Sequence, residues 1–158
     1  MAQENIIIRQ ATKNDVPTLV RLNHALFLED AGQRDPFMDL DWPLKEGEAY
    51  FNKHMLSPKS IALLAEIDGK TVGYLIGYLR GVSTLRPIQM AELESMFVEK
   101  VYRSQTIGEQ LVQSFLIWAE KHGAERVSVT AYTANEGAVS FYERQGFLSK
   151  STTLEIGL

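Results

Sequence analysis

The sequence predicts an α+β fold in three layers, with helices on both faces of a mixed β-sheet. Two β-rich runs flank Asp68-Gly69, a dipeptide that strongly favours a tight antiparallel hairpin. Further along, apolar residues recur at helical spacing over 107–119, and a β-branched run follows at 126–130. The second pattern indicates a strand-helix-strand unit behind an antiparallel front half. With 158 residues and no internal repeat or linker, the chain is expected to form one domain over residues 1–158.

The front half begins with a short strand and an amphipathic helix. Thr12-Lys-Asn-Asp15 is a capping-box pattern before the apolar spacing that runs from Val16 to Phe27. Because Pro17 disfavours an earlier helix start, Asp15 is the alternative cap. Glycine and proline then interrupt the pattern from Glu29 to Trp42, which predicts a loop. The remaining elements of this half are a strand at 6–9, a helix at 46–56, and strands at 60–67, 71–80 and 88–98.

The back half is expected to alternate between helix and strand. Gly123 suits the C-terminal cap of the helix before it, and Gly146 suits the same position in the next helix, for which Asn135 is the N-cap. The expected elements are a helix at 107–122, a strand at 126–130, a helix between 135 and 146, and a last strand at 147–156.

Composition excludes several classes of function. The chain is 45% hydrophobic and 23% charged, as in water-soluble globular proteins, and its net charge of −4 disfavours nucleic-acid binding. It contains no cysteine, which excludes disulfides and thiolate chemistry. No apolar run is long enough to span a membrane, and the N-terminus lacks the pattern of a secretory signal. We therefore expect a cytoplasmic protein without membrane or nucleic-acid partners.

An anion site is predicted where the strand that ends at Val98 turns into the helix that begins at Ile107. The first backbone N–H groups of a helix are unpaired, and the helix dipole adds positive charge there. Arg103 can contribute a forked, permanently charged donor, and Ser104 a hydroxyl. Such a turn can hold a pyrophosphate. Taken alone, the pattern is better explained by an ordinary strand-to-helix connection that carries a surface arginine.

This turn resembles the acetyl-CoA signature of the GNAT superfamily of N-acetyltransferases. The match covers Arg103, Ile107 and Gly108, and it fails at Thr106, where the family usually has glycine. Glycine permits a positive φ and a close approach to phosphate, whereas threonine is β-branched and stiff. The departure at Thr106 therefore bears on one phosphate contact.

A second segment resembles the other GNAT signature, Asn-x-x-Ala-x-x-Phe-Tyr-x-x-x-Gly-Phe, at every fixed position from Asn135 to Phe147. The resemblance implies a twisted mixed sheet of about six to seven strands flanked by about four helices. It also implies that the pantetheine arm of acetyl-CoA lies where the fourth and fifth strands splay apart. The residues expected to contact acetyl-CoA are Phe97, Val98, Arg103, Ser104, Thr106, Ile107, Gly108, Asn135 and Tyr142.

Acetyl transfer to an amine requires a base and benefits from an acid. An alkyl ammonium with a pKa of about 10 is almost fully protonated at pH 7, so a carboxylate that accepts its proton assists the attack. Glu92 and Glu94 lie on one face of their strand by alternation. Glu92, six residues before Val98, is similar in position to the general base of histone-acetylating GNAT members, and Glu94 is the second candidate. Tyr142 matches the family tyrosine that is thought to protonate the leaving thiolate. The alternatives are solvated carboxylates and a core tyrosine.

The acceptor is predicted from the segment between Glu29 and Glu48. It holds seven acidic and two basic residues, a net charge of −5, interleaved with Phe37, Trp42 and Tyr50. In GNAT proteins this region borders the acceptor site. The pattern favours a pocket for an amphipathic amine, and a solvated loop is the alternative.

Together these patterns predict an acetyl-CoA-dependent N-acetyltransferase that modifies a primary amine of a cationic small molecule, such as a polyamine or aminoglycoside. One alternative is acetylation of a protein lysine or N-terminal amine. Another is a non-catalytic acyl-CoA-binding regulatory domain; Thr106 keeps this alternative open, and Glu92 with Tyr142 favours the enzyme. The three histidines show no metal-ligand spacing, so no metal is expected. The sequence leaves open whether the chain acts alone or as a homodimer.

Overall fold

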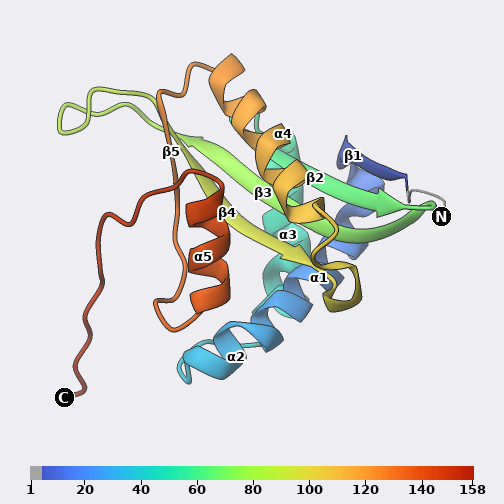
Figure 1. Cartoon of the computed structure of the whole chain (residues 1–158), viewed down its shortest axis with the longest axis horizontal. Helices are drawn as coiled ribbons and strands as arrows, with labels where there is room; N and C mark the ends of the chain where they lie inside the picture. Colours follow the sequence, from blue (N-terminus) through green and yellow to red (C-terminus); the bar gives the residue numbers. More distant parts are fainter. Residues whose placement is uncertain (1–4) are drawn as a thin grey trace.

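The computed structural model describes residues 5–158, which fold around one five-stranded sheet (Figure 1). The strands follow the chain in order, β1-β2-β3-β4-β5. Pairing is antiparallel from β1 to β4, and β5 runs parallel to β4. The strands are β1 (Ile6–Gln10), β2 (Ser60–Ile67), β3 (Lys70–Arg80), β4 (Met90–Val98) and β5 (Arg126–Val129).

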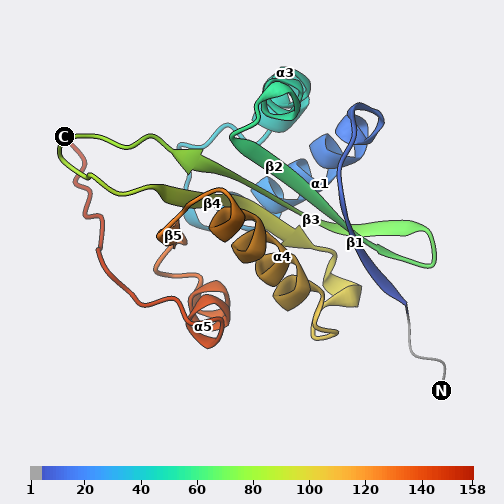
Figure 2. The same cartoon turned by 90° about the horizontal axis from the view of Figure 1, so that it is seen from above.

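Helices cover both faces of the sheet. Figure 2 shows α1 and α3 on one face and α4 and α5 on the other. This arrangement confirms the predicted α+β class with a mixed sheet between two helical layers. The helices are α1 (Val16–Glu29), α2 (Ala31–Arg34), α3 (Trp42–Leu56), α4 (Ile107–Lys121) and α5 (Glu136–Arg144), with 3-10 turns η1 (Lys13–Asp15) and η2 (Lys100–Tyr102).

Each face of the sheet has its own core. On the α4 face the apolar spacing of the sequence is realised in full. The buried residues of α4 are Ile107, Leu111, Val112, Phe115 and Ala119. Gly77 in β3 lets this helix approach closely, because a Cβ there would lie 2.3 Å from Cε2 of Phe115. On the opposite face, α1 and α3 pack through Leu19, Leu22 and Phe51 against Tyr74 and Ile76 of β3. Burial of one such large apolar side chain stabilises the fold by about 1.5–3 kcal/mol.

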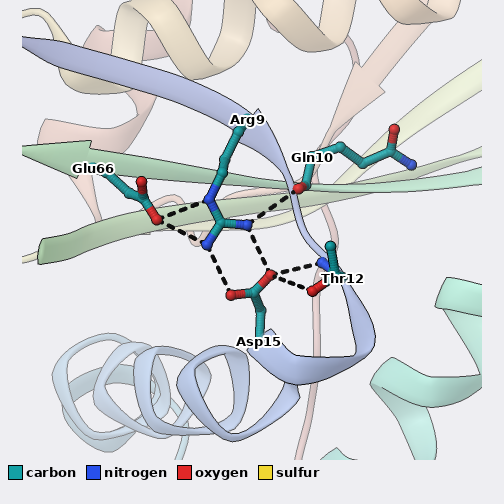
Figure 3. Close-up of polar contacts among 5 residues, drawn as sticks. All are labelled: Arg9, Gln10, Thr12, Asp15 and Glu66. Atoms are coloured by element: carbon teal, nitrogen blue, oxygen red, sulfur yellow. Dashed lines mark hydrogen bonds and ion pairs between the residues drawn. The ribbon is translucent and has the colours of Figure 1, made fainter. Parts of the chain in front are cut away.

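The side chains of Arg9, Asp15 and Glu66 form a cluster of ion pairs, the Arg9 cluster, which connects β1 to the start of α1 and to β2 (Figure 3). Two nitrogens of Arg9 each lie 2.8 Å from an Asp15 oxygen, and Nε donates to Glu66 of β2 at 2.8 Å. Asp15 also accepts from the Thr12 backbone N–H at 2.7 Å, which confirms the predicted capping box. As expected from Pro17, the α-helix itself begins only after Asp15.

Several predicted boundaries require correction. The sheet has five strands, not six to seven, because residues 147–158 form no strand. Their apolar side chains Leu148, Leu154 and Ile156 are more than 85% exposed, and without a hydrogen-bonded neighbour a short alternating run does not form a strand. Helix α3 starts at Trp42 and not at Glu46, since proline is tolerated in the first turn of a helix.

Two further local features bear on the sequence predictions. The short helix α2 lies within the segment predicted as a loop. The Asp68-Gly69 hairpin is confirmed, with φ values of 49° and 78° that match its turn type. Within residues 5–158, no helix is long and apolar enough to cross a lipid bilayer.

Candidate active site

The strands β4 and β5 separate halfway along β4. They pair only from Met90 to Leu93 of β4, opposite Arg126 to Val129 of β5. Figure 1 shows the chain that follows β5 running away from the arrow of β4. The backbone of β4 from residue 94 to 98 therefore has no partner on the β5 side. This is the splay in which the pantetheine arm was expected.

The turn from β4 to α4 has an unusual backbone. Ser104 and Thr106 both adopt positive φ, at 66° and 64°. Thr106 immediately precedes the first residue of α4, so this threonine adopts the left-handed conformation that glycine takes readily. A non-glycine residue in this region costs roughly 1–2 kcal/mol. The Thr106 hydroxyl accepts a hydrogen bond from Gln110 Nε2 at 3.0 Å.

Arg103 is bound on two sides within the chain. Its Nε donates to the Val98 carbonyl at 2.8 Å, and its Nη1 and Nη2 lie 2.6 and 2.8 Å from the two oxygens of Glu29 at the end of α1. The guanidinium also lies 5.3 Å from the ring centroid of Phe97. Arg103 is therefore at the predicted mouth of the cofactor site, although its charge is directed toward Glu29. Ser104 is exposed nearby.

The two signature segments meet in space. A Cβ at Gly108 would lie 3.2 Å from Cζ of Phe141, so this glycine allows α5 to pack against the first turn of α4. Ile107 is 2% exposed and belongs to the core, which leaves only its backbone for a ligand. Phe97 and Val98 are also buried, so they too can offer only backbone groups.

Asn135 has two roles at the start of α5. Its Oδ1 accepts from the Ala138 N–H at 3.1 Å, which confirms the predicted cap. Its Nδ2 donates to Oδ1 of Asp30 at 3.0 Å. Asp30 follows Glu29 directly, so the junction between α1 and α2 holds one side chain from each signature segment, Arg103 and Asn135. This junction was not predicted as part of the site.

Tyr142 lies on α5 among apolar groups and is largely enclosed. Its ring contacts Phe141 and Phe147 edge to face, with centroids 5.2 and 5.6 Å apart. Burial raises the pKa of the Tyr142 hydroxyl above 10, and the nearby Tyr74 and Asp30 raise it further. A phenol in this environment keeps its proton at neutral pH and is suited to donate it.

Tyr74 belongs to a buried polar network that the sequence did not reveal. Its hydroxyl accepts from Asn23 Nδ2 of α1 at 2.8 Å and lies 2.9 Å from Oγ of Ser95, in the unpaired half of β4. Asn23 is 4% exposed. The network fixes the strand where β4 leaves β5. The alternation of Tyr74 and Tyr78 along β3 was the signal that could have indicated a polar function on this face.

Glu92 is a buried carboxylate in the paired half of β4. It is 8% exposed and accepts from Ser128 Oγ of β5 at 2.6 Å, and Arg80 Nε lies 3.5 Å away. Its direct cross-strand neighbour is Tyr78. Because Tyr78 and Tyr74 alternate on the α1 and α3 side, Glu92 faces the same side of the sheet.

Glu94 differs from Glu92 because β4 is irregular there. The register shifts from Leu93 opposite Gly77 to Ser95 opposite Ile76, so Glu94 is an extra residue in β4. It is exposed, and both carboxylates lie close enough to Tyr78 to raise the pKa of its hydroxyl, after the larger effect of burial. Both carboxylates therefore lie near Tyr78, on the same face of the sheet. A bulge in β4, and not the simple alternation used for the prediction, brings Glu94 there.

The acidic segment between Glu29 and Glu48 has fewer carboxylates free to bind a cation than its composition suggested. Within it, Asp30 pairs with Arg34 and Asp39 with Lys45, and Asp41 Oδ1 lies 3.3 Å from His24 Nε2. Of its aromatic residues, Trp42 and Tyr50 contact edge to face at 5.4 Å. Phe37, by contrast, is 92% exposed and lies in no aromatic pair found in residues 5–158. The predicted grouping of three rings is therefore wrong for Phe37.

The described part of the chain, residues 5–158, contains no group of three or more His, Asp or Glu side chains arranged to hold a metal ion.

Comparison with known proteins identifies relatives of this architecture. The model of the acetyltransferase (GNAT) family matches residues 24–147. An uncharacterized N-acetyltransferase of Methanocaldococcus jannaschii is 30% identical over 101 residues, 64% of this chain and 45% of that protein. An N-alpha-acetyltransferase of Sulfurisphaera tokodaii is 29% identical over 146 residues, 89% of this chain and 78% of that protein. The chain thus spans less than half the length of the first of these relatives.

Solved structures share the fold. A mutant protein from Bacillus halodurans has a TM-score of 0.86 at 20% identity, over 96% of this chain and 99% of its own. An aminoglycoside N-acetyltransferase in complex with CoA has a TM-score of 0.77 at 17% identity, over 99% and 97%. An aminoglycoside acetyltransferase from an uncultured soil metagenomic sample, in complex with sisomicin, has a TM-score of 0.71 at 19% identity, over 97% and 95%.

Proposed function

Because the chain belongs to the GNAT family of acetyltransferases, we propose that it transfers the acetyl group of acetyl-CoA directly to a primary amine. The observation that supports this most strongly is the separation of β4 from β5 beyond Leu93. It leaves backbone groups of β4 free to pair with an extended thioester substrate. Tyr142 lies on the α5 side of this opening, while Glu92 lies on the α1 and α3 side of the sheet.

Each end of acetyl-CoA has suitable residues. The backbones of Phe97 and Val98 would pair with pantetheine, as a neighbouring strand would. The pyrophosphate would bind to the N–H groups at the start of α4 and to the guanidinium of Arg103, which would have to leave Glu29 to reach it. The Val98 carbonyl already accepts from Arg103 Nε, and its second lone pair can accept from a pantetheine N–H.

The chemistry assigns one proton to each of two residues. Glu92 accepts the proton that the acceptor ammonium loses, directly or through water. The amine nitrogen then forms a bond to the acetyl carbon while the bond from that carbon to sulfur breaks. Tyr142 donates its proton to the departing thiolate, which leaves as CoA. The phenolate that remains on Tyr142 accepts the second proton of the acetylated nitrogen through water, so the product is a neutral amide. Effects of this kind contribute about 10²–10⁴-fold each to a rate.

The acceptor we propose is a cationic small molecule, of the polyamine or aminoglycoside type. Two carboxylates, Glu92 and Glu94, lie on the α1 and α3 side of the sheet, to which we assign the acceptor, and Trp42 and Tyr50 of α3 form a ring contact there. The fold shared with aminoglycoside acetyltransferases is consistent with a small amine. The Sulfurisphaera tokodaii relative, an N-alpha-acetyltransferase, supports a protein N-terminal amine as the second candidate.

The test is a measurement of CoA release with acetyl-CoA and a panel of amines. The panel contains monoamines, polyamines, aminoglycosides, and peptides with a free N-terminus or an internal lysine. We expect turnover with a small cationic amine, reduced by Glu92→Gln and unchanged by Glu120→Gln, a surface carboxylate of α4. If the protein binds acetyl-CoA and releases CoA with none of these amines, it is an acyl-CoA-binding domain and not an enzyme.

A further inference from the structure

We propose that Glu94 and the rings of Tyr50, His54 and Tyr78 form a subsite for a second ammonium group of the acceptor, which makes the preferred substrate a diamine or a longer polycation. The inference rests on the proposed acetyl transfer and adds to it where the unreacted end of the substrate binds. It also separates the two candidate bases: Glu92 takes the proton, and Glu94 binds charge.

The subsite is a cleft between α3 and the sheet. Its volume is about 400 Å³. One wall comes from α3 and the segment that follows it, and the other from β3 and β4. The lining residues are Tyr50, His54, Ser57, Lys59, Ser60, Tyr78, Leu79 and Glu94.

Glu94 is directed to this cleft by the bulge in β4. The extra residue in β4 places Glu94 beside Tyr78, which lines the same cleft. Glu92 is already paired with Ser128 and Arg80. In contrast, Glu94 forms no ion pair with any residue from 5 to 158. An exposed carboxylate without a cation, within a cleft, is available to a positively charged ligand.

The remaining walls suit an ammonium group. The rings of Tyr50 and His54 lie 4.5 Å apart, and those of His54 and Tyr78 lie 6.1 Å apart, so three aromatic rings follow one another along the cleft. Aromatic faces attract cations within about 6 Å of the ring centroid. Burial lowers the pKa of His54, and the charge of Lys53 lowers it further, so His54 is neutral at pH 7 and does not repel a cation. Burial raises the pKa of Tyr50 above 10.

The cleft is adjacent to the proposed base. Tyr78 faces Glu92 directly across β3 and β4, and the charges of both Glu94 and Glu92 act on its hydroxyl. Two positions along a strand span about 6–7 Å. A diamine with a few methylene groups can therefore present one nitrogen near Glu92 while the other binds Glu94.

Among the residues that the structure describes, Lys59 is the one basic side chain with a permanent charge that lines the cleft. It is exposed, so solvent screens its charge. It would repel the far end of a polycation and attract a carboxylate. The alternative to a diamine is therefore an acceptor that carries one amine and one carboxylate, which Lys59 would attract.

The experiment compares three acceptors of similar length: butylamine, 1,4-diaminobutane and 4-aminobutanoate. With wild-type protein, kcat/KM should be highest for the diamine. Glu94→Gln should raise KM for the diamine about tenfold, the effect of losing one charge-assisted contact, and leave kcat and the KM for butylamine within twofold. Glu48→Gln, an exposed carboxylate on α3, is the matched control and should change neither. Lys59→Gln should lower the KM for the diamine.

Two results overturn the proposal: a wild-type preference for 4-aminobutanoate, or an equal loss of kcat with butylamine and the diamine in Glu94→Gln, which would make Glu94 the base. Failure of the proposed acetyl transfer is distinguished by a binding measurement. If no amine is acetylated, calorimetry with 1,4-diaminobutane still tests the subsite. Binding that Glu94→Gln weakens supports it, and no binding, or binding indifferent to Glu94→Gln, overturns it.

Discussion

The guanidinium of Arg103 lies 2.6 Å from the carboxylate of Glu29, across 74 positions of sequence. The residue expected to bind pyrophosphate is thus held by the last residue of α1. An anion that binds Arg103 must replace Glu29. The α1–α2 junction, which also holds Asn135 through Asp30, is thereby linked to occupancy of the cofactor site.

Removing the charge of Glu29 should strengthen acetyl-CoA binding. Both partners are partly exposed, and exposed ion pairs contribute about 0.2–1 kcal/mol, so Glu29→Gln should lower the Kd by up to about fivefold. Isothermal titration calorimetry with acetyl-CoA measures this, with Glu46→Gln on α3 as the control. Weaker binding in Glu29→Gln would show instead that Glu29 orients Arg103 for the ligand.

Thr106→Gly should stabilise the fold. Glycine relieves the positive φ of 64°, a gain of roughly 1–2 kcal/mol, and its greater freedom in the unfolded chain offsets about 0.5–1 kcal/mol of that gain. The expected net change is an increase of a few degrees in Tm, measured by thermal unfolding without ligand. Ser104→Gly, at a φ of 66°, should behave alike. A fall in Tm would mean that the hydrogen bond between Gln110 and the Thr106 hydroxyl outweighs the backbone strain.

Tyr142→Phe should lower kcat by about 10²-fold, the lower end for an acid catalyst, because a thiolate is a fair leaving group. The ring and its contacts with Phe141 and Phe147 remain, so Tm and acetyl-CoA affinity should be unchanged. Because burial raises the pKa of Tyr142, wild-type activity should not decline through loss of this proton as pH rises from 7 to 9. Steady-state kinetics over this range provide the measurement. Unaltered kcat in Tyr142→Phe would exclude the assigned role.

The Arg9 cluster should make stability depend on acid pH. Hydrogen bonds from Arg9 hold the pKa of Asp15 far below its ordinary value of 3.8. A carboxyl with a depressed folded-state pKa stabilises the fold above its unfolded-state pKa, and that stability is lost as pH falls toward the folded value. Asp15→Asn should therefore lower the free energy of unfolding by about 1–2 kcal/mol at pH 7, and the difference from wild type should shrink below about pH 4. Urea unfolding of both proteins from pH 7 to pH 2.5 measures it; a deficit that is constant with pH would contradict the assignment.

Local sequence patterns were sufficient to predict most helices and strands and part of the candidate site. The spacing of Ile107, Leu111 and Phe115 predicted the buried face of α4, and the cap formed by Asn135 was visible in one short segment. Such features depend on neighbours three or four positions away. Thr106 adopts a positive φ at the position where the resembled loop usually has glycine, but the sequence alone did not show that threonine would take this conformation.

The features that could not be predicted from the sequence depend on contacts between residues that are far apart along the chain. The register shift that isolates Glu94 exists only against β3, and local composition suggests nothing of it. The acid count near Phe37 was correct, but which acids form ion pairs is decided by partners such as Arg103, outside the segment. In residues 147–158 polar and apolar residues alternate, but residues 5–158 provide no neighbouring strand to pair with them. The strand predicted at 147–156 from this pattern was therefore wrong.

Gly77 has a consequence for anyone who wishes to redesign the acceptor preference. Its missing side chain is replaced by the ring of Phe115, and the Glu92 carbonyl would lie 2.7 Å from an added Cβ. Mutant libraries that enlarge this position should yield misfolded or cofactor-deficient clones, since β3 cannot shift without displacing α4 and the turn that precedes it. Diversity introduced at Tyr50 and His54, on the helix across the cleft, should be tolerated far better, and selection for new amines is best begun there.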